Sequence, residues 1–139
     1  MRRIGNHALW IGPALNAGGL RTVHDHGIEA VVDLAINEPI PQLTRELIYC
    51  RFPIVDGSGN RPELLRMAVM TTADLIRSGT PTLVFCSAGM SRSPAIAAAA
   101  LAVATGQSAA SCLAEVLGSG PRDLSPPLWQ DLVQLLSET

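Results

Sequence analysis

Short apolar runs alternate with longer amphipathic or alanine-rich segments along this chain. Residues 28–34 and 82–86 form nearly continuous apolar runs rich in β-branched side chains, a pattern typical of buried strands. Residues 62–76 instead place apolar side chains at helical spacing, and Asn60 and Glu63 on either side of Pro62 indicate a helix start. Strands are expected over residues 8–11, 28–34, 47–55 and 82–86, and helices over 13–27, 62–76, 93–105, 108–117 and 127–137.

Strands that alternate with helices predict an α/β fold with a mainly parallel central sheet flanked by helices. No linker, repeat or charge block divides the 139 residues, so a single domain over residues 1–139 is expected. Ligands of such sheets bind at the carboxyl ends of the strands. Cys86, Asp56 and the loop after Leu34 all fall at that edge, which predicts one site there.

The composition of the chain argues against several kinds of partner and location. The net charge is −2, and all ten basic residues are scattered arginines, so the chain offers no basic stripe for nucleic acid or an anionic membrane. No apolar stretch reaches the ~20 residues that a membrane span needs, and the first seven residues are too polar for a signal peptide. Three widely spaced cysteines do not suggest a disulfide framework. A cytoplasmic protein is therefore expected.

The most informative segment is Cys86-Ser87-Ala88-Gly89-Met90-Ser91-Arg92, which joins an expected strand to an expected helix. A loop in this position turns its backbone N–H groups inward, and the helix adds its positive dipole end, so the segment predicts a cup for a phosphate-like dianion. The same field favours thiolate over thiol at Cys86, and Arg92 can clamp two phosphate oxygens. Phosphoryl transfer through a cysteinyl-phosphate is the functional interpretation. The alternative is a buried structural cysteine and a solvent-facing arginine at a spacing that arises by chance.

A thiolate that attacks a phosphomonoester needs an acid to protonate the leaving oxygen and a base to activate water afterwards, and one carboxyl group can do both. Asp56 precedes Cys86 by thirty residues, at the carboxyl end of an expected strand, beside Gly57-Ser58-Gly59. Asp56-Gly57 can equally be a turn dipeptide, and spacing alone does not decide. Asp33, within a strand, and Glu38, expected on the rim, are weaker candidates.

No metal or cofactor is expected. His24-Asp25-His26 could suggest a metal site, but side chains two apart do not share a helix face, and histidines at a helix end fit the helix dipole instead. Cys50 and Cys112 are expected to pack in the core. A nucleotide-binding loop of the Walker type lacks its lysine.

Residues 86–94 resemble the signature of the dual-specificity type of cysteine-dependent phosphatases, in the protein tyrosine phosphatase superfamily. Residues 8–12 resemble the opening strand of that family, residues 51–56 the strand and loop that carry the general acid, and Pro121-Arg122 with residues 126–132 the last connection and C-terminal helix. The resemblance thus spans almost the whole chain in the right order.

The resemblance implies a phosphotyrosine phosphatase-like fold and a role for each site residue. Cys86 would be the nucleophile, Arg92 the phosphate clamp, Asp56 the general acid, and Ser93 the hydroxyl that eases departure of the sulfur. The phosphate would lie on residues Ser87, Ala88, Gly89, Met90, Ser91 and Arg92, and phosphate or sulfate is expected to bind there.

The expected function is therefore that of a metal-independent phosphomonoester hydrolase acting on a phosphorylated protein or a small phosphomonoester. Lysines in the loop, usual in relatives that act on polyphosphorylated lipids, are missing, which disfavours an inositide substrate. Phe85 stands where the family usually has histidine, and this departure favours the alternative of a weakly active or inactive phosphate-binding module. A rhodanese-like sulfur carrier is a third interpretation, against which Arg92 and the separate Asp56 argue.

Overall fold

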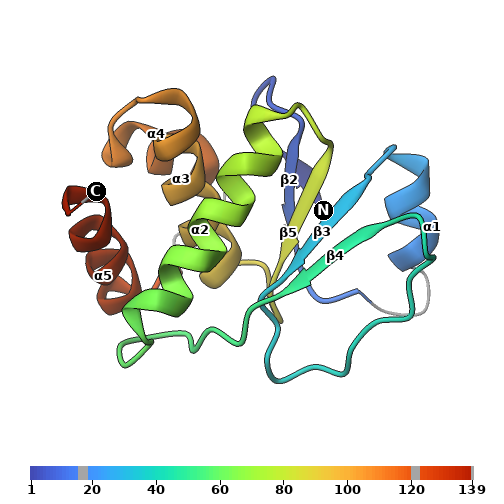
Figure 1. The fold of residues 1–139 in the computed structure, drawn as a ribbon, viewed down its shortest axis with the longest axis horizontal. Coiled ribbons are helices and arrows are strands. Elements are labelled where there is room, and N and C mark those ends of the chain that lie inside the picture. The colour runs from blue at the N-terminus through green and yellow to red at the C-terminus, as the bar shows by residue number, and fades with distance from the viewer. Residues whose placement is uncertain (16–18, 120–122, 139) are drawn as a thin grey trace.

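The computed structural model describes residues 1–15, 19–119 and 123–138, and its centre is a five-stranded sheet (Figure 1). The strands are β1 (Arg2–Arg3), β2 (Leu9–Gly12), β3 (Ala30–Asp33), β4 (Ile48–Arg51) and β5 (Thr82–Phe85). Their order is β1-β2-β5-β3-β4; β1 pairs antiparallel with β2, and every other pairing is parallel. The predicted α/β fold with a mainly parallel sheet is confirmed.

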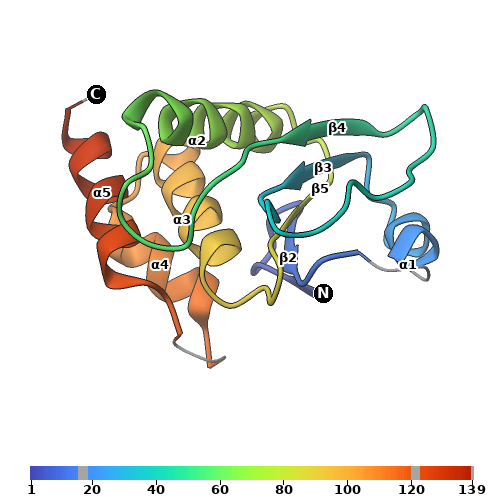
Figure 2. The ribbon, with the colours of Figure 1, turned by 90° about the horizontal axis from the view of Figure 1, so that it is seen from below.

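Helices cover both faces of the sheet, unequally (Figures 1 and 2). The short α1 (Gly19–Asp25) lies on one face, apart from the other helices. The larger layer on the opposite face comprises α2 (Pro62–Arg77), α3 (Arg92–Thr105), α4 (Ala109–Leu117) and α5 (Pro126–Ser137). None of the described helices combines the length and the apolar character that crossing a bilayer requires.

Alternation along the strands divides the core into two clusters. On the side of the four-helix layer, Val84 and Cys86 pack with a run of alanines in α3, residues 95 and 97–99, all of which are fully buried. Alanine lets neighbouring helices approach α3 closely, which explains why this helix can be buried on all sides. On the α1 side, Leu83 and Phe85 pack with Trp10 and Val23. The ring of Phe85 thus lies in the second cluster, while the side chain of Cys86 lies in the first.

The sheet register places the last residues of the four parallel strands side by side. Phe85 pairs with both Gly12 and Asp33, and Asp33 pairs with Arg51. The segments that follow these four residues therefore leave the sheet from one row, and the candidate site is built from them.

Two expected elements differ at their ends. The helix expected from Pro13 begins, within the described residues, only at Gly19, because Ala14 N–H donates to the carbonyl of Ser87 (3.2 Å) and holds this segment against the loop after β5. The strand expected over residues 47–55 ends at Arg51, two residues before Pro53, which has no N–H to donate to a ladder. The short β1 was not predicted.

The residues around the start of α2 have other roles than the sequence indicated. Helix α2 does begin at Pro62, but Asn60 does not cap it: the N-cap residue is Arg61, and its side chain makes no capping hydrogen bond. The side chain of Asn60 instead bonds to the main chain of Val55 and Gly57. The polar side chain that the sequence placed at a helix end thus serves the preceding loop.

Replacement of Phe85 by histidine tests its packing role. Phe85 is 1% exposed among apolar side chains, so Phe85→His places a polar ring where it must lose its hydration. We expect the free energy of unfolding to fall by about 1–3 kcal/mol, measured by urea denaturation. Phe85→Leu is the control that keeps the site apolar and should cost about 1 kcal/mol. A Phe85→His protein as stable as the wild type would show that a polar partner exists in this cluster.

Candidate active site

The segment from Cys86 to Arg92 connects β5 to α3 and curls around the sulfur of Cys86. Gly89 N–H donates to Cys86 Sγ (3.2 Å), and the thiol donates to Ser93 Oγ (3.4 Å) in the first turn of α3. Cys86 is 2% exposed and Ser93 is fully buried. The sulfur therefore lies at the floor of the loop, at the N-terminal end of a 14-residue helix whose dipole favours negative charge there.

Gly89 has the conformation that the curl requires. Its φ is +72°, and a Cβ there would lie 2.6 Å from the carbonyl carbon of Gly12 and 2.8 Å from Pro13 N. The loop thus rests on the main chain at the end of β2, and only glycine fits. This contact and the Ala14–Ser87 bond join the loops after β2 and β5.

Arg92 is a buried cation whose partners are neutral. Nη1 donates to the carbonyls of Leu34 (3.1 Å) and Ile54 (3.2 Å), and Nη2 donates to Ser87 Oγ (3.0 Å). Only 8% of Arg92 is exposed. In the part of the chain that the structure describes, no carboxylate forms an ion pair with this guanidinium. The positive charge next to Cys86 is therefore fixed in place and uncompensated, which suits an anionic ligand.

Asp56 is held beside the cup by Ser91, a residue of the cup. Ser91 Oγ donates to Asp56 Oδ1 (2.5 Å) and accepts a hydrogen bond from Ser125 N–H (2.9 Å). Ser125 is the N-cap of α5. The Ser91 hydroxyl thus joins three segments that lie far apart in the sequence: the loop between β4 and α2 that carries Asp56 (the acidic loop), the cup, and the start of α5.

Asp33 and Glu38, the weaker candidates for the acid, belong to a separate network. Asp33, 1% exposed, accepts hydrogen bonds from Ala35 N–H (2.8 Å) and Tyr49 Oη (2.5 Å) and lies 3.8 Å from Arg51 Nε. Burial is the main cause that raises the pKa of Tyr49, and its hydrogen bond to the Asp33 carboxylate raises this pKa further. Arg51 Nη2 donates to the carbonyls of Ala35 (3.0 Å) and Glu38 (2.7 Å). This network fixes the turn after β3, so that the carbonyl of Leu34 meets Arg92.

A cavity of about 170 Å³ opens over the cup. It is lined by Asp56, Cys86, Ser87, Ala88, Met90, Ser91, Arg92 and Asp123. The structure therefore brings Cys86, Arg92 and Asp56 to one cavity, together with every predicted loop residue except Gly89. Gly89 instead packs against the main chain of Gly12 and Pro13. Ser93 lies beneath the sulfur. Arg92 is the only cation among these side chains, and Met90 supplies an apolar edge.

Sequence reasoning missed two residues near the site. Asp123 lines the cavity, and its position in the connection before the last helix, at the carboxyl edge of the sheet, was the available signal. Asn60 holds the acidic loop; an Asx residue closing Asp-Gly-Ser-Gly-Asn is a known turn former, but the proline after Arg61 favoured a helix-start interpretation. Pro121 and Arg122, part of the sequence resemblance, lie outside the described residues.

The other residues weighed for chemistry lie elsewhere. Cys112 is buried and Cys50 half-buried, both against the larger core cluster, and burial raises the pKa of each thiol. His26 Nδ1 lies 2.9 Å from the carbonyl of Thr22, one turn earlier, and its ring meets Trp10 edge-on. His26 is thus an exposed residue just after α1 that contacts the end of this helix and Trp10.

Solved structures share this arrangement over nearly the whole chain. Human DUSP28 matches with a TM-score of 0.83 at 25% identity, covering 98% of this chain and 95% of that one. A mouse putative dual specificity phosphatase complexed with zinc tungstate matches with a TM-score of 0.82 at 26% identity, covering 98% and 86%. A human tyrosine phosphatase-like serine/threonine/tyrosine-interacting protein shares the fold at 22% identity, with a TM-score of 0.73 and coverage of 94% and 89%.

Neither the family models nor the curated protein sequences compared with this chain gave a match. The structural match nevertheless extends from the first strand to the last helix, in the order that the sequence resemblance gave. The chain thus has the fold of the dual-specificity phosphatases, within the protein tyrosine phosphatase superfamily.

Proposed function

We propose that this protein is a metal-independent phosphomonoester hydrolase that works through a cysteinyl-phosphate intermediate. The observation that carries the proposal is the buried guanidinium of Arg92, whose described partners are neutral oxygens and which lines the same cavity as Cys86. A bound phosphate would replace Ser87 Oγ as the partner of Nη2 and supply the missing negative charge. The tungstate in the mouse relative, a tetrahedral oxyanion, is consistent with this use of the fold.

The first step forms a bond between sulfur and phosphorus. The Cys86 thiolate attacks the phosphorus, the ester P–O bond breaks, and the leaving oxygen takes the proton of Asp56. Arg92 and the loop N–H groups stabilise the charge on the equatorial oxygens. Because Asp56 lines the same cavity as Cys86, one small substrate can reach both.

The second step reverses the roles. The Asp56 carboxylate takes a proton from water, the water oxygen bonds to phosphorus, and the S–P bond breaks with its electron pair returning to sulfur. Ser93 Oγ accepts from the Cys86 thiol in the structure (3.4 Å); once the sulfur has lost its proton, the same hydroxyl can donate to the departing thiolate. Inorganic phosphate is released, and no other reactant is consumed.

The substrate is proposed to be a phosphorylated protein or small molecule with one phosphomonoester at the reacting position. Among the described residues that line the cavity, Arg92 is the single cation, while Asp56 and Asp123 are acidic. A polyphosphorylated group would bring further negative charge toward these two carboxylates. A reducing compartment suits the free thiol.

A weakly active phosphate-binding module is the second candidate, and Phe85 favours it. The phenyl ring before the nucleophile carries no hydrogen-bonding group and lies in the α1-side cluster. It can therefore give no polar support to the cup. Turnover decides between the two candidates, because both bind phosphate.

Replacement of Gly89 by alanine tests the cup. The new Cβ would collide with main-chain atoms of residues 12 and 13, which cannot rotate away, so the loop must shift. We expect affinity for tungstate to fall roughly tenfold or more, since the loop amides no longer converge on one point. Gly79→Ala is a matched control: Gly79 has the same φ of +72°, but nothing lies within 4 Å of its added Cβ. Equal effects of both variants on tungstate affinity, measured by calorimetry, would contradict the cup.

Replacement of Cys86 by serine tests the nucleophile. The variant should lose p-nitrophenyl phosphate turnover yet retain tungstate binding, because the loop and Arg92 remain. Wild-type turnover should be unchanged by a chelator, since no step involves a metal. Full activity of Cys86→Ser, or loss of wild-type activity with chelator, would disprove the mechanism. Tungstate binding without turnover in the wild type would establish the binding module instead.

Replacement of Asp56 by asparagine tests the acid. We expect kcat for phenyl phosphate to fall ~10²–10⁴-fold, because its leaving group needs a proton, and kcat for p-nitrophenyl phosphate to fall much less. Asp123→Asn, which removes the other carboxylate lining the cavity, should leave the ratio between the two substrates unchanged. An equal loss on both substrates in Asp56→Asn would show that Asp56 has a structural role only.

A further inference from the structure

The loop that carries Asp56 is exposed and contains two glycines, yet Asp56 has to meet a leaving group at one defined place. Asp56 and Val55 are both exposed, and Gly57 and Gly59 have the positive φ values that glycine allows, +156° and +92°. Such a segment has little packing of its own to hold it. Hydrogen bonds must therefore supply the order. One lies within the turn, from Gly57 N–H to the carbonyl of Val55 (3.0 Å). The others come from two side chains: Ser91, which contacts the carboxylate, and Asn60, which contacts the main chain.

Asn60 binds the loop at three points on either side of Asp56. Its Oδ1 accepts from Val55 N–H (2.8 Å), and its Nδ2 donates to the carbonyls of Val55 (2.9 Å) and Gly57 (3.3 Å). The amide thus pairs with both polar groups of the residue before Asp56 and with the carbonyl of the residue after it. The carbonyl oxygen and the NH₂ group of one side chain are both used, which fixes the orientation of the amide as well as the loop.

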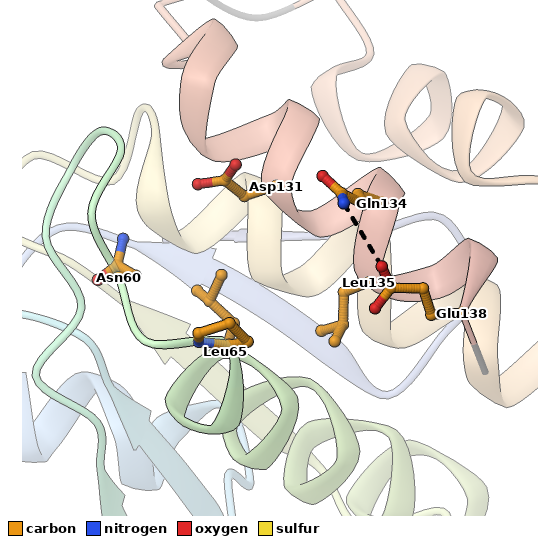
Figure 3. A pocket seen from close by; sticks show the side chains of 7 residues that line it. Asn60, Leu65, Asp131, Gln134, Leu135 and Glu138 are labelled. Carbon is orange, nitrogen blue, oxygen red and sulfur yellow. Dashed lines mark hydrogen bonds between the residues drawn. The ribbon is translucent and has the colours of Figure 1, made fainter.

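The position of Asn60 along the chain makes this clamp rigid. It lies two residues before Pro62, the first residue of the 16-residue helix α2, which packs on the sheet through buried residues such as Leu65 and Val69. On its other side, Asn60 lines a cavity of about 190 Å³ between the start of α2 and α5 (Figure 3). Leu65, Leu135, Asp131 and Gln134 lie around the same cavity, and none of these four side chains bonds to residues 55–57.

We infer that Asn60 is the positioning residue that holds the carboxylate of Asp56 over the cup, a role that rests on the proposed function. Asn60 acts through the main chain of residues 55–57 and touches neither Cys86 nor the substrate. Ser91 alone cannot do this, because its single hydrogen bond to Oδ1 and the turn bond from Gly57 N–H to the Val55 carbonyl leave the turn as a whole unattached to the start of α2, and Asn60 supplies that attachment. With Asn60 in place, the carboxyl group of Asp56 is held in one position relative to the leaving oxygen.

The test is the effect of Asn60→Ala in two backgrounds. In the wild-type background we expect kcat for phenyl phosphate to fall about tenfold or more, with a much smaller loss for p-nitrophenyl phosphate and with tungstate affinity unchanged. In the Asp56→Asn background, Asn60→Ala should cause no further loss, because the group it positions is already gone. Asn60→Asp should be intermediate, since it keeps the acceptor for Val55 N–H and loses both donors.

Gln134→Ala is the matched control, because Gln134 is the other amide on the wall of the cavity and its side chain bonds to Glu138 (3.4 Å), the C-cap residue of its own helix (Figure 3). It should leave the ratio between the two substrates unchanged. An equal loss on both substrates in Asn60→Ala, a further loss in the Asp56→Asn background, or no loss at all would each overturn the inference.

Amide hydrogen exchange separates this inference from the proposed function. Asn60→Ala should speed exchange at Val55 N–H roughly tenfold or more, because its acceptor is removed, while exchange in the core of α3 stays the same. Unchanged exchange at Val55 would show that Asn60 does not hold the loop and would overturn the inference. A wild-type protein without turnover but with this change in exchange would overturn the proposed hydrolase, leaving Asn60 as the clamp of the loop.

Discussion

The burial of Arg92 is the constraint on which the rest of the site depends. A guanidinium withdrawn from water must find acceptors for its N–H groups, and here it finds them at the ends of two different loops, in the carbonyls of Leu34 and Ile54. Those bonds draw the segments after β3 and β4 toward the start of α3. Because the described acceptors are neutral, the positive charge of Arg92 has no ion-pair partner among the described residues, and an anion is the ligand that best supplies one.

Supporting contacts place each acceptor and each reacting group. The Asp33–Tyr49–Arg51 network fixes the turn that carries Leu34, and the close approach of Gly89 to the end of β2 fixes the curl around Cys86. Ser91 ties the Asp56 carboxylate to the cup and to the N-terminus of α5. None of these groups needs to react. Each removes freedom from a segment whose position the proposed chemistry requires, which is how a small fold can preorganise a site made mostly of loops.

The position before the nucleophile shows how packing and chemistry are separated in this fold. Successive residues of a strand face opposite sides of the sheet, so Phe85 belongs to the α1-side core, while Cys86 faces the four-helix layer and the cup. An apolar ring at residue 85 therefore strengthens a core without changing the atoms that line the cavity. Phe85, where the family usually has histidine, thus changes the core behind the Cys86–Arg92 loop but not the residues that line the cavity.

Local rules in the sequence determined the type of almost every element and the strand–loop–helix unit around Cys86, because apolar periodicity and the order of small residues are local properties. The ends of elements were decided by tertiary contacts: residues 13–15 stay out of a helix because they support the cup, and Asn60 serves the acidic loop rather than capping α2. The sequence could name Cys86, Arg92 and Asp56, but it left Asp33 as a rival acid and did not reveal Asp123. Only the fold, by bringing separate strand ends to one edge, decided which carboxylates share a cavity with the sulfur.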